Sequence, residues 1–238
     1  MIPLYHDFSG ETVLIFGGGA VGARKAERFA DETRVVVVSP AFDDRLLGRD
    51  DTPTVGMDDP HTGDSAGANH HEPGIDLVRA APDPEAVTAW IERADPVLVV
   101  AATDDRTINA AAESAALDAD VLINRTDTAG SRPAGSVVVP ATIEDDPVRV
   151  ALSTGGTSPA LAKALRERIE AEIADAGAMA ALSGSLRSEL KTRGVDPDKR
   201  REAIRRVVRS EGVWKGLQKG GSNGRKEADA VIDEVLDR

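Results

Sequence analysis

A short apolar segment followed by three spaced glycines most limits how this chain can fold. Residues 12–16 are largely apolar and have the pattern of a buried strand. Gly17, Gly19 and Gly22 follow at the GxGxxG spacing, and a helical pattern begins at residue 20. In such a unit the glycines permit a tight turn, a close approach of pyrophosphate and close helix–strand packing. The motif predicts a dinucleotide phosphate site; the alternative is a glycine-rich turn without a ligand.

Apolar strand patterns alternate with helical patterns as far as residue 124. Because these strands are apolar throughout, the alternation predicts a parallel α/β sheet with helices on both faces. The expected strands are residues 12–16, 34–39, 75–79, 96–102 and 121–124, and the expected helices are residues 20–30, 85–93 and 107–117. Residues 50–74, rich in Asp, Gly, Pro and His, are expected to form a solvated loop or insertion.

The pattern changes after residue 124. Residues 136–140 and 148–153 are strand-like and are separated by an acidic turn, so antiparallel pairing is expected. Ser158 and Pro159 form a good helix start, because serine can cap and proline suits the first turn. Further helices are expected over residues 179–191, 198–209 and 227–236, with a flexible link over 220–224. The predicted layout is a Rossmann-type domain over 1–118, a small β segment over 119–157 and a helical domain over 158–238.

The composition narrows the function classes. None of the 238 residues is cysteine, which excludes disulfides and thiolate metal sites. The formal net charge of −12 and the few aromatic residues disfavour nucleic acid and anionic membranes as partners. With neither a signal peptide nor a membrane-length apolar stretch, a cytoplasmic protein is expected. The acidic surface also fits a salt-rich cytoplasm, where ions screen self-repulsion.

The ends of the predicted strands bear on the cofactor. An acidic residue at the end of the second strand grips the ribose of NAD, whereas an arginine there accommodates the 2′-phosphate of NADP. Neither stands at this strand's end; Asp43 and Asp44 lie slightly beyond, to reach the ribose or to cap the next helix. Since no basic residue is placed for a 2′-phosphate, we expect NAD. At these strand ends, the expected cofactor contacts beside the glycines are Ser39, Ala102 and Thr103.

Several motifs together resemble the precorrin-2 dehydrogenase family, the N-terminal module of siroheme synthases. They are residues 17–25 (GGGAVGARK), residues 100–105 (VAATDD) with Asn109, Asn124-x-x-Asp127, and residues 150–166 (VALSTGGTSPALAKALR). Without a methyltransferase module after them, the chain is similar to the stand-alone form of the family. The resemblance implies NAD-dependent oxidation of precorrin-2 to sirohydrochlorin, with iron or cobalt insertion in some members. It also implies a homodimer in which residues 136–153 are exchanged or paired between subunits.

The resemblance also implies site residues. The family's cofactor contacts beside the glycines fall on Ala20, Val21, Ala41 and Phe42. The family's functional aspartate falls on Asp127, and the serine of its glycine-rich motif falls on Thr154, which keeps a hydroxyl but adds a methyl group. We expect Asp127 to act as general base; without the family match it would only begin a turn before Gly130. Residues 154–158 would present backbone N–H groups, left accessible by the glycines, at a helix N-terminus. Together with nearby cations, these donors suit a macrocycle with eight carboxylates. The expected substrate-binding residues are Arg125, Gly155, Gly156, Thr157, Ser158 and Lys163.

Some alternatives stay open. The cations near these motifs, Arg132, Arg149 and Arg166 among them, either bind carboxylates or form solvated surface. Metal ligands are undefined, because His61, His70 and His71 lie in the Asp-rich insertion, where a solvated loop is favoured over a metal site. A dehydrogenase of small carbonyl compounds lacks the needed residues, since the only tyrosine is Tyr5 and no histidine follows His71. The remaining rival function is a regulatory module that binds NAD without catalysis.

Overall fold

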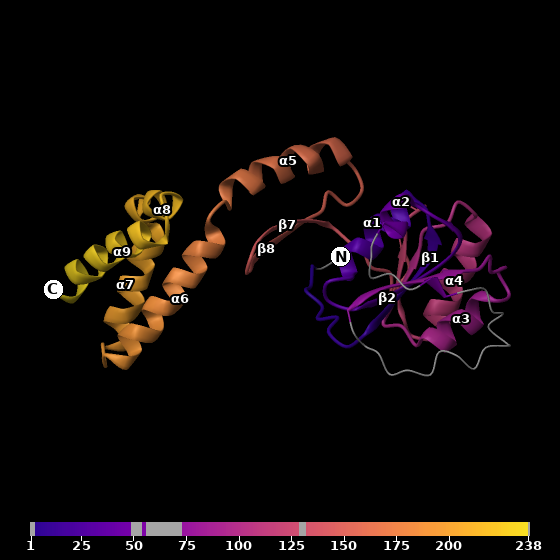
Figure 1. The fold of residues 1–238 in the computed structure, drawn as a ribbon, viewed down its shortest axis with the longest axis horizontal. Coiled ribbons are helices and arrows are strands. Elements are labelled where there is room, and N and C mark those ends of the chain that lie inside the picture. The colour runs from indigo at the N-terminus through magenta and orange to yellow at the C-terminus, as the bar shows by residue number, and fades with distance from the viewer. Residues whose placement is uncertain (1–2, 49–53, 56–72, 129–131, 238) are drawn as a thin grey trace. The chain divides into compact units, whose positions relative to one another are not determined.

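The central strand of the sheet, β1 (Thr12–Gly18), is buried along its whole length, as its apolar residues predict. The computed structural model describes residues 3–48, 54–55, 73–128 and 132–237, and its elements are shown in Figure 1. The chain divides into two compact units, Met1–Val139 and Pro140–Arg238. Each unit has a core of its own, so each is described by itself.

Six parallel strands form the sheet of the first unit, in the order β3-β4-β2-β1-β5-β6. Around β1 lie β2 (Arg34–Phe42), β4 (Gly74–Arg79), β5 (Leu98–Ala101) and β6 (Leu122–Arg125), and β3 (Thr54–Val55) forms one edge. The chain crosses from one side of β1 to the other between β4 and β5. Ligands of open α/β sheets bind beyond the carboxyl ends of the strands at such a switch point. The predicted Rossmann-type sheet is confirmed.

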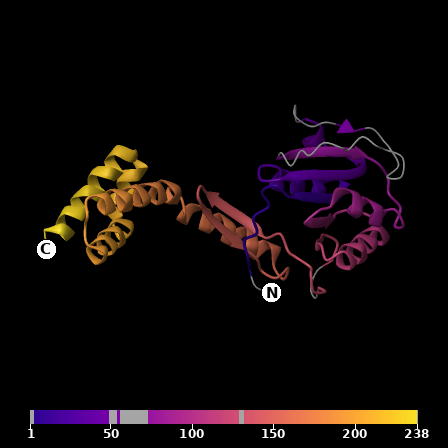
Figure 2. The same ribbon diagram turned by 90° about the horizontal axis from the view of Figure 1, so that it is seen from below.

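Successive residues of β1 face two separate layers of helices. Val13 and Ile15 join a buried cluster with α1, whereas Leu14 and Phe16 join a cluster with α3 and α4. The helices of this unit are α1 (Ala20–Phe29), α2 (Asp44–Leu47), α3 (Val87–Ala94) and α4 (Arg106–Asp118). In Figure 2, α3 and α4 appear in magenta against one face of the sheet. The sheet is therefore covered on both faces, which is why its strands are apolar throughout.

The second unit combines a two-stranded hairpin with five helices. Strands β7 (Ala141–Asp145) and β8 (Val148–Leu152) pair antiparallel. The helices are α5 (Pro159–Glu172), α6 (Ala176–Thr192), α7 (Pro197–Arg209), α8 (Glu211–Gln218) and α9 (Gly221–Leu236). Buried apolar residues of α6 to α9 form one core, which includes Met179, Leu186, Val207 and Ile232. The hairpin meets α6 where the Gly177 N–H donates to Asp145 Oδ2 at 2.9 Å.

Three sequence-based expectations differ from this fold. The strand paired with β8 is β7, not residues 136–140; within that stretch Ser136 makes only an isolated bridge with Ile123. Residues 220–224 are not a flexible link, because α9 begins at Gly221. The expected boundary after residue 118 does not coincide with the division after Val139, because β6 pairs with β5 inside the first sheet. Most of the expected insertion over 50–74 lies outside the described residues.

Candidate functional site

The three glycines of the predicted phosphate loop occupy different environments. Gly17 has a φ of +107°, and a Cβ there would lie 2.5 Å from the Ala102 carbonyl oxygen. A Cβ on Gly22 would overlap the Gly17 carbonyl oxygen. A Cβ on Gly19, in contrast, would meet nothing within 4 Å. Packing therefore requires glycine at residues 17 and 22, whereas Gly19 faces open space.

The space in front of Gly19 has the chemistry of a phosphate site. Gly19 is the N-cap of α1 and provides no side-chain cap. The N–H groups of Ala20, Val21 and Gly22 lie in the first turn, where they have no acceptor within the helix. Val21 is 39% exposed beside them. Free donors and the positive end of the helix dipole fit a pyrophosphate, and a side chain at Gly19 would fill the space that it needs.

The end of β2 is ordered by hydrogen bonds within its own segment. Ser39 Oγ donates to the Ala41 carbonyl oxygen at 2.7 Å, and Asp43 Oδ1 accepts from the Arg45 N–H at 3.1 Å as the cap of α2. Ala41 is exposed and Phe42 is half-buried. Of the two roles considered for Asp43, the structure shows that of a helix cap. Ala41 and Phe42 border the carboxyl edge of the sheet.

A cation that the sequence analysis missed lies beside this strand end. Arg79, the last residue of β4, pairs with Ser39 in the strand register. Its guanidinium carbon lies 5.2 Å from the centroid of the Phe42 ring, and its Nη1 donates to the Pro40 carbonyl oxygen at 2.9 Å. A basic residue therefore does stand near the end of β2, which bears on the expectation that none is placed for a 2′-phosphate. Only the strand order, with β4 next to β2, could have revealed Arg79.

Asn109 of α4, which is fully buried, fixes the end of β5. Its Oδ1 accepts from the Thr103 N–H at 3.1 Å and from the Thr103 hydroxyl at 2.8 Å, and its Nδ2 donates to the Thr103 carbonyl oxygen at 3.0 Å. The half-buried Ala102 donates its N–H to the Phe16 carbonyl oxygen at 2.8 Å. The turn that carries Ala102 and Thr103 is thus held by one buried amide side chain.

Asp127, two residues beyond β6, is held by Arg125 in a bidentate ion pair. Arg125 Nε lies 3.0 Å from Asp127 Oδ1, and Arg125 Nη2 lies 2.7 Å from Asp127 Oδ2. Arg125 Nη1 lies 3.0 Å from Glu113 Oε2 of α4. The side chains of Arg125 and Asp127 are 11% and 15% exposed. This arginine is therefore placed between two carboxylates of its own chain.

These contacts set the protonation state of Asp127. The hydrogen bonds from Arg125 lower the pKa of Asp127, which burial alone would raise, and the Asn109 amide makes a smaller contribution in the lowering direction. Asp127 is therefore anionic at neutral pH. Arg125, predicted to bind substrate, has its guanidinium on Asp127 and Glu113, which is the arrangement of a residue that orients Asp127.

The loop after β6 is tied together by Arg132 and Asn124. Arg132 Nη1 donates to the Arg125 carbonyl oxygen at 3.1 Å, and its Nη2 donates to the Thr128 carbonyl oxygen at 2.8 Å. Asn124 Nδ2 donates to the Val137 carbonyl oxygen at 2.7 Å, while its buried Oδ1 has no partner among the described residues. The alternative interpretation is that Asp127 only begins a turn before Gly130. Gly130 lies outside the described residues.

The predicted carboxylate loop, residues 154–158, belongs to the second unit. Gly155 and Gly156 have φ values of +62° and +78°, and a Cβ on either would meet nothing within 4 Å. Thr157 Oγ1 donates to the Thr154 carbonyl oxygen at 2.6 Å, and Ser158 Oγ accepts from the Leu161 N–H at 3.3 Å as the cap of α5. The loop therefore presents open glycine backbone directly before a helix.

The other cations named near these motifs form exposed ion pairs. Lys163 Nζ lies 3.9 Å from Glu167 Oε1, and the Lys163 side chain is 75% exposed. Arg166 pairs with Glu170 at 3.5 Å, and Arg149 with Glu144 at 3.8 Å. Pairs of this kind contribute little to stability, so those of Lys163 and Arg166 could exchange for a ligand.

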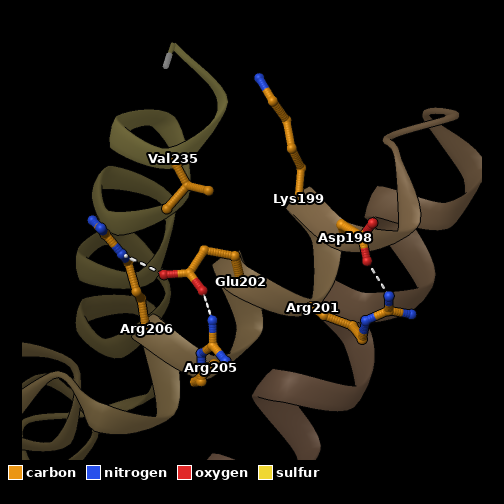
Figure 3. Close-up of a pocket in the computed structure, with 7 residues that line it drawn as sticks. All are labelled: Asp198, Lys199, Arg201, Glu202, Arg205, Arg206 and Val235. Carbon is orange, nitrogen blue, oxygen red and sulfur yellow. Dashed lines mark hydrogen bonds and ion pairs between the residues drawn. The ribbon is translucent and has the colours of Figure 1, made fainter.

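A hollow in the second unit is lined by charged residues of α7 and by Val235 of α9, as Figure 3 shows. Arg205 and Arg206 both pair with Glu202, and Arg201 pairs with Asp198. Because these side chains are exposed and paired with one another, the hollow is a solvated helix face.

The described residues give no evidence of a metal centre or a membrane span. No group of three or more His, Cys, Asp and Glu in the described ranges is placed to hold a metal ion. His61, His70 and His71 lie outside those ranges. None of the helices in the described part of the chain combines the length and hydropathy that a bilayer crossing needs.

Comparison with known proteins agrees with this architecture. Residues 4–141 match a family described as "Putative NAD(P)-binding", and residues 145–172 match one described as "Sirohaem biosynthesis protein central". A precorrin-2 dehydrogenase from Methanosarcina barkeri strain Fusaro is 32% identical over 236 residues, which cover 99% of this chain and 95% of the relative. Siroheme synthase 1 from Aeromonas salmonicida strain A449 is 31% identical over 98% of this chain, which spans only 44% of that protein. The solved structure of SirC, a precorrin-2 dehydrogenase, has a TM-score of 0.66 at 18% identity, over 98% of this chain and all of that one, and so shares the fold.

Proposed function

The chain belongs to the family of precorrin-2 dehydrogenases and siroheme synthases, and on that premise we propose that it oxidises precorrin-2 to sirohydrochlorin with NAD, in the biosynthesis of siroheme or a related tetrapyrrole. One observation carries the proposal beyond family membership. The anionic Asp127 follows β6, and the phosphate-loop glycines follow β1, so both stand at the carboxyl edge of one parallel sheet. A proton acceptor and a dinucleotide site at the same edge suit a dehydrogenase.

The first unit supplies the groups that this oxidation needs. The turn at Gly17 and Gly19 and the first-turn N–H groups of α1 would hold the pyrophosphate, and the ends of β2 and β5 would border the riboses. Bound NAD supplies the hydride acceptor for a ring carbon of the macrocycle. The reaction also releases a proton, for which Asp127 is the acceptor that we propose.

The ion pair with Arg125 decides how Asp127 can act. Because Arg125 contacts both oxygens of the carboxylate, the group is fixed in position and stays anionic near neutral pH. A carboxyl with a lowered pKa also passes its proton on to water readily, so it returns to the charged form after each turnover. Glu113 holds Arg125 from the other side and limits its movement.

The second unit offers the proposed contacts for the substrate's carboxylates. Open backbone at Gly155 and Gly156, directly before the capped α5, suits a carboxylate at a helix N-terminus. Thr154 and Lys163 complete the proposed substrate-binding set. We treat metal insertion as a separate activity, because Thr154 replaces the serine usual in the family motif.

We further propose a homodimer that acts in a salt-rich cytoplasm. Neither β8 nor α5 contains a buried residue, and Leu161 of α5 is 51% exposed. A two-stranded sheet is marginal by itself, so a second copy that covers the hairpin and α5 would bury their apolar residues. The net charge of −12 fits a setting in which salt screens repulsion between two such chains.

The test is anaerobic absorbance of the purified protein with precorrin-2 and NAD in high salt, with and without cobalt. We expect NADH formation together with a sirohydrochlorin spectrum, and the same result with the Lys215→Met variant as a control for surface substitution. A further shift with cobalt, above the uncatalysed rate, would add metal insertion. No oxidation by folded protein that binds NAD would favour the regulatory module instead.

A further inference from the structure

A cationic cluster on and beside α1 is exceptional in this acidic chain. Many of its cations stand next to acids; Arg34 pairs with Asp76 at 2.7 Å, for example, and Arg225 with Glu189 at 2.6 Å. We define the α1 cluster as Arg24, Lys25, Arg28 and Arg132; the three arginines are the charged groups whose repulsion acts on the central residue, Lys25.

Lys25 is the central member of the α1 cluster. Its side chain is half-buried, and it makes no hydrogen bond or ion pair with any described residue. Burial, followed by repulsion from Arg28, Arg24 and Arg132, lowers the pKa of Lys25 to about 8. Desolvation and the neighbouring positive charges both disfavour the charged form of Lys25 in the free protein. A bound anion would stabilise that charged form.

Arg132 connects the α1 cluster to the segment that carries Asp127. It donates to the carbonyl oxygens of Arg125 and Thr128, on either side of Asp127. These acceptors are neutral, and no carboxylate among the described residues pairs with Arg132. Lys25 and Arg132 are therefore the two members of the cluster without an acidic partner among the described residues, and Arg132 contacts the segment of the proposed proton acceptor.

We propose that the α1 cluster, through Lys25 and Arg132, binds a carboxylate substituent of the tetrapyrrole substrate. The proposal rests on the proposed function for the identity of the anion. Precorrin-2 and sirohydrochlorin both carry carboxylates around the whole rim of the ring, so one of them can reach this cluster while the ring faces Asp127. An arginine and a half-buried lysine together provide directional and charge-based recognition of such a group.

The position of Lys25 on α1 favours the tetrapyrrole over the cofactor phosphates. Lys25 is five residues past Ala20, which is about 8 Å along the helix axis from the first turn. The pyrophosphate site lies at that first turn, in front of Gly19. Arg132, in contrast, belongs to the loop of Asp127. The two sources of anion can be separated by experiment.

The test is calorimetric titration of the full chain with sirohydrochlorin, in two buffers that differ in ionisation enthalpy. Arginines do not titrate in this range, so Lys25 is the group of the cluster whose protonation can change. A carboxylate beside Lys25 raises its pKa above the value of about 8 in the free protein. We therefore expect binding above pH 8 to take up a fraction of a proton, and the uptake to diminish at pH 7.

Two substitutions at Lys25 separate charge from packing. Lys25→Met should weaken sirohydrochlorin binding about tenfold and abolish the proton uptake, because the cation is lost. Lys25→Arg should keep most of the affinity yet also abolish the uptake, because arginine stays charged. Lys215→Met, at an exposed lysine of α8, should match the unchanged chain in both measurements.

The outcomes distinguish this proposal from the proposed function. Equal affinity and proton uptake in Lys25→Met and the unchanged chain would overturn the carboxylate site, whatever the enzyme assay shows. An effect of Lys25→Met on the titration with NAD alone would assign the cluster to the cofactor phosphates instead. If the protein does not oxidise precorrin-2 but still shows proton-linked binding of sirohydrochlorin, the result supports the carboxylate site and contradicts the proposed dehydrogenase activity.

Discussion

Arg125 contacts both carboxylate oxygens of Asp127, at 3.0 and 2.7 Å, while Glu113 holds the same guanidinium from its other side at 3.0 Å. The carboxylate is thereby oriented before any substrate binds. A group prepared in this way loses no free energy to reorientation during the reaction. If Asp127 is the proton acceptor that we propose, Arg125 acts on the reaction through it, as a positioning residue.

Arg125→Met should lower kcat about tenfold and change the KM for precorrin-2 little, because the variant loses the orientation of Asp127 but no substrate contact. The pKa of Asp127 should rise, since its lowering depends first on Arg125. A raised pKa moves the acid limb of the kcat/KM profile to higher pH. Steady-state kinetics across pH would measure both effects.

The matched control is Arg34→Met, which removes an arginine–aspartate pair with Asp76 at the opposite end of the sheet. It should leave kcat and the pH profile unchanged. A large rise in KM at unchanged kcat in Arg125→Met would instead mean that Arg125 binds the substrate directly.

Asp127→Asn should reduce kcat by about 100-fold or more, the usual contribution of a general base, because the amide cannot take up the proton. NAD affinity should not change, since Asp127 does not line the glycine turn. Fluorescence or calorimetric titration with NAD would check the second point. An unchanged oxidation rate would remove Asp127 from the mechanism.

Gly19→Val and Gly22→Ala should separate cofactor binding from folding. Gly19 faces open space, so Gly19→Val should keep the melting temperature and lose NAD binding. The added Cβ in Gly22→Ala overlaps the Gly17 carbonyl oxygen, so this variant should lose about 2 kcal/mol of stability or more. Thermal melts with and without NAD would compare the two. Unchanged NAD affinity in Gly19→Val would contradict the phosphate site.

Arg79→Ser should reduce any use of NADP relative to NAD by a factor of about 10 to 100. Arg79 stands beside the end of β2, where a 2′-phosphate would lie, and a hydrogen bond to a charged group contributes about 1.5–3 kcal/mol. The NADP/NAD ratio of kcat/KM is the quantity to measure. If that ratio does not change, Arg79 serves only to pack on Phe42 and to bind the Pro40 carbonyl.

Local sequence rules were sufficient where one segment determines its own structure. The sheet could be predicted because both faces of β1 are buried, which leaves an apolar run with no polar alternation. The glycine turn could be predicted because the tight turn and the contact of Gly22 with Gly17 involve residues five apart. Asp127 was found through family resemblance, since its own neighbours suggest only a turn.

Tertiary packing decided the points that the sequence analysis missed. Residues 136–140 look like a strand because Val137 and Val139 pack against the core of the first unit, not because they pair with β8. Residues 220–224 have the composition of a linker, yet a Cβ on Gly224 would lie 2.5 Å from Leu217 Cδ2, so close packing of α8 on α9 favours a helix there. The partnership of Arg125 with Glu113 likewise depends on how α4 lies against β6.

The exposure of α5 has a consequence for hydrogen exchange. This helix of 14 residues has no buried residue; it contacts β7, and its other support is the Ser158 cap, Pro159 in the first turn and exposed ion pairs. A helix of that length is marginal unless it buries an apolar face, so its amide protons in an isolated chain should exchange much faster than those of α6 around Leu186 and Leu190. Slow exchange in α5 would then be a direct signal that another surface has covered it.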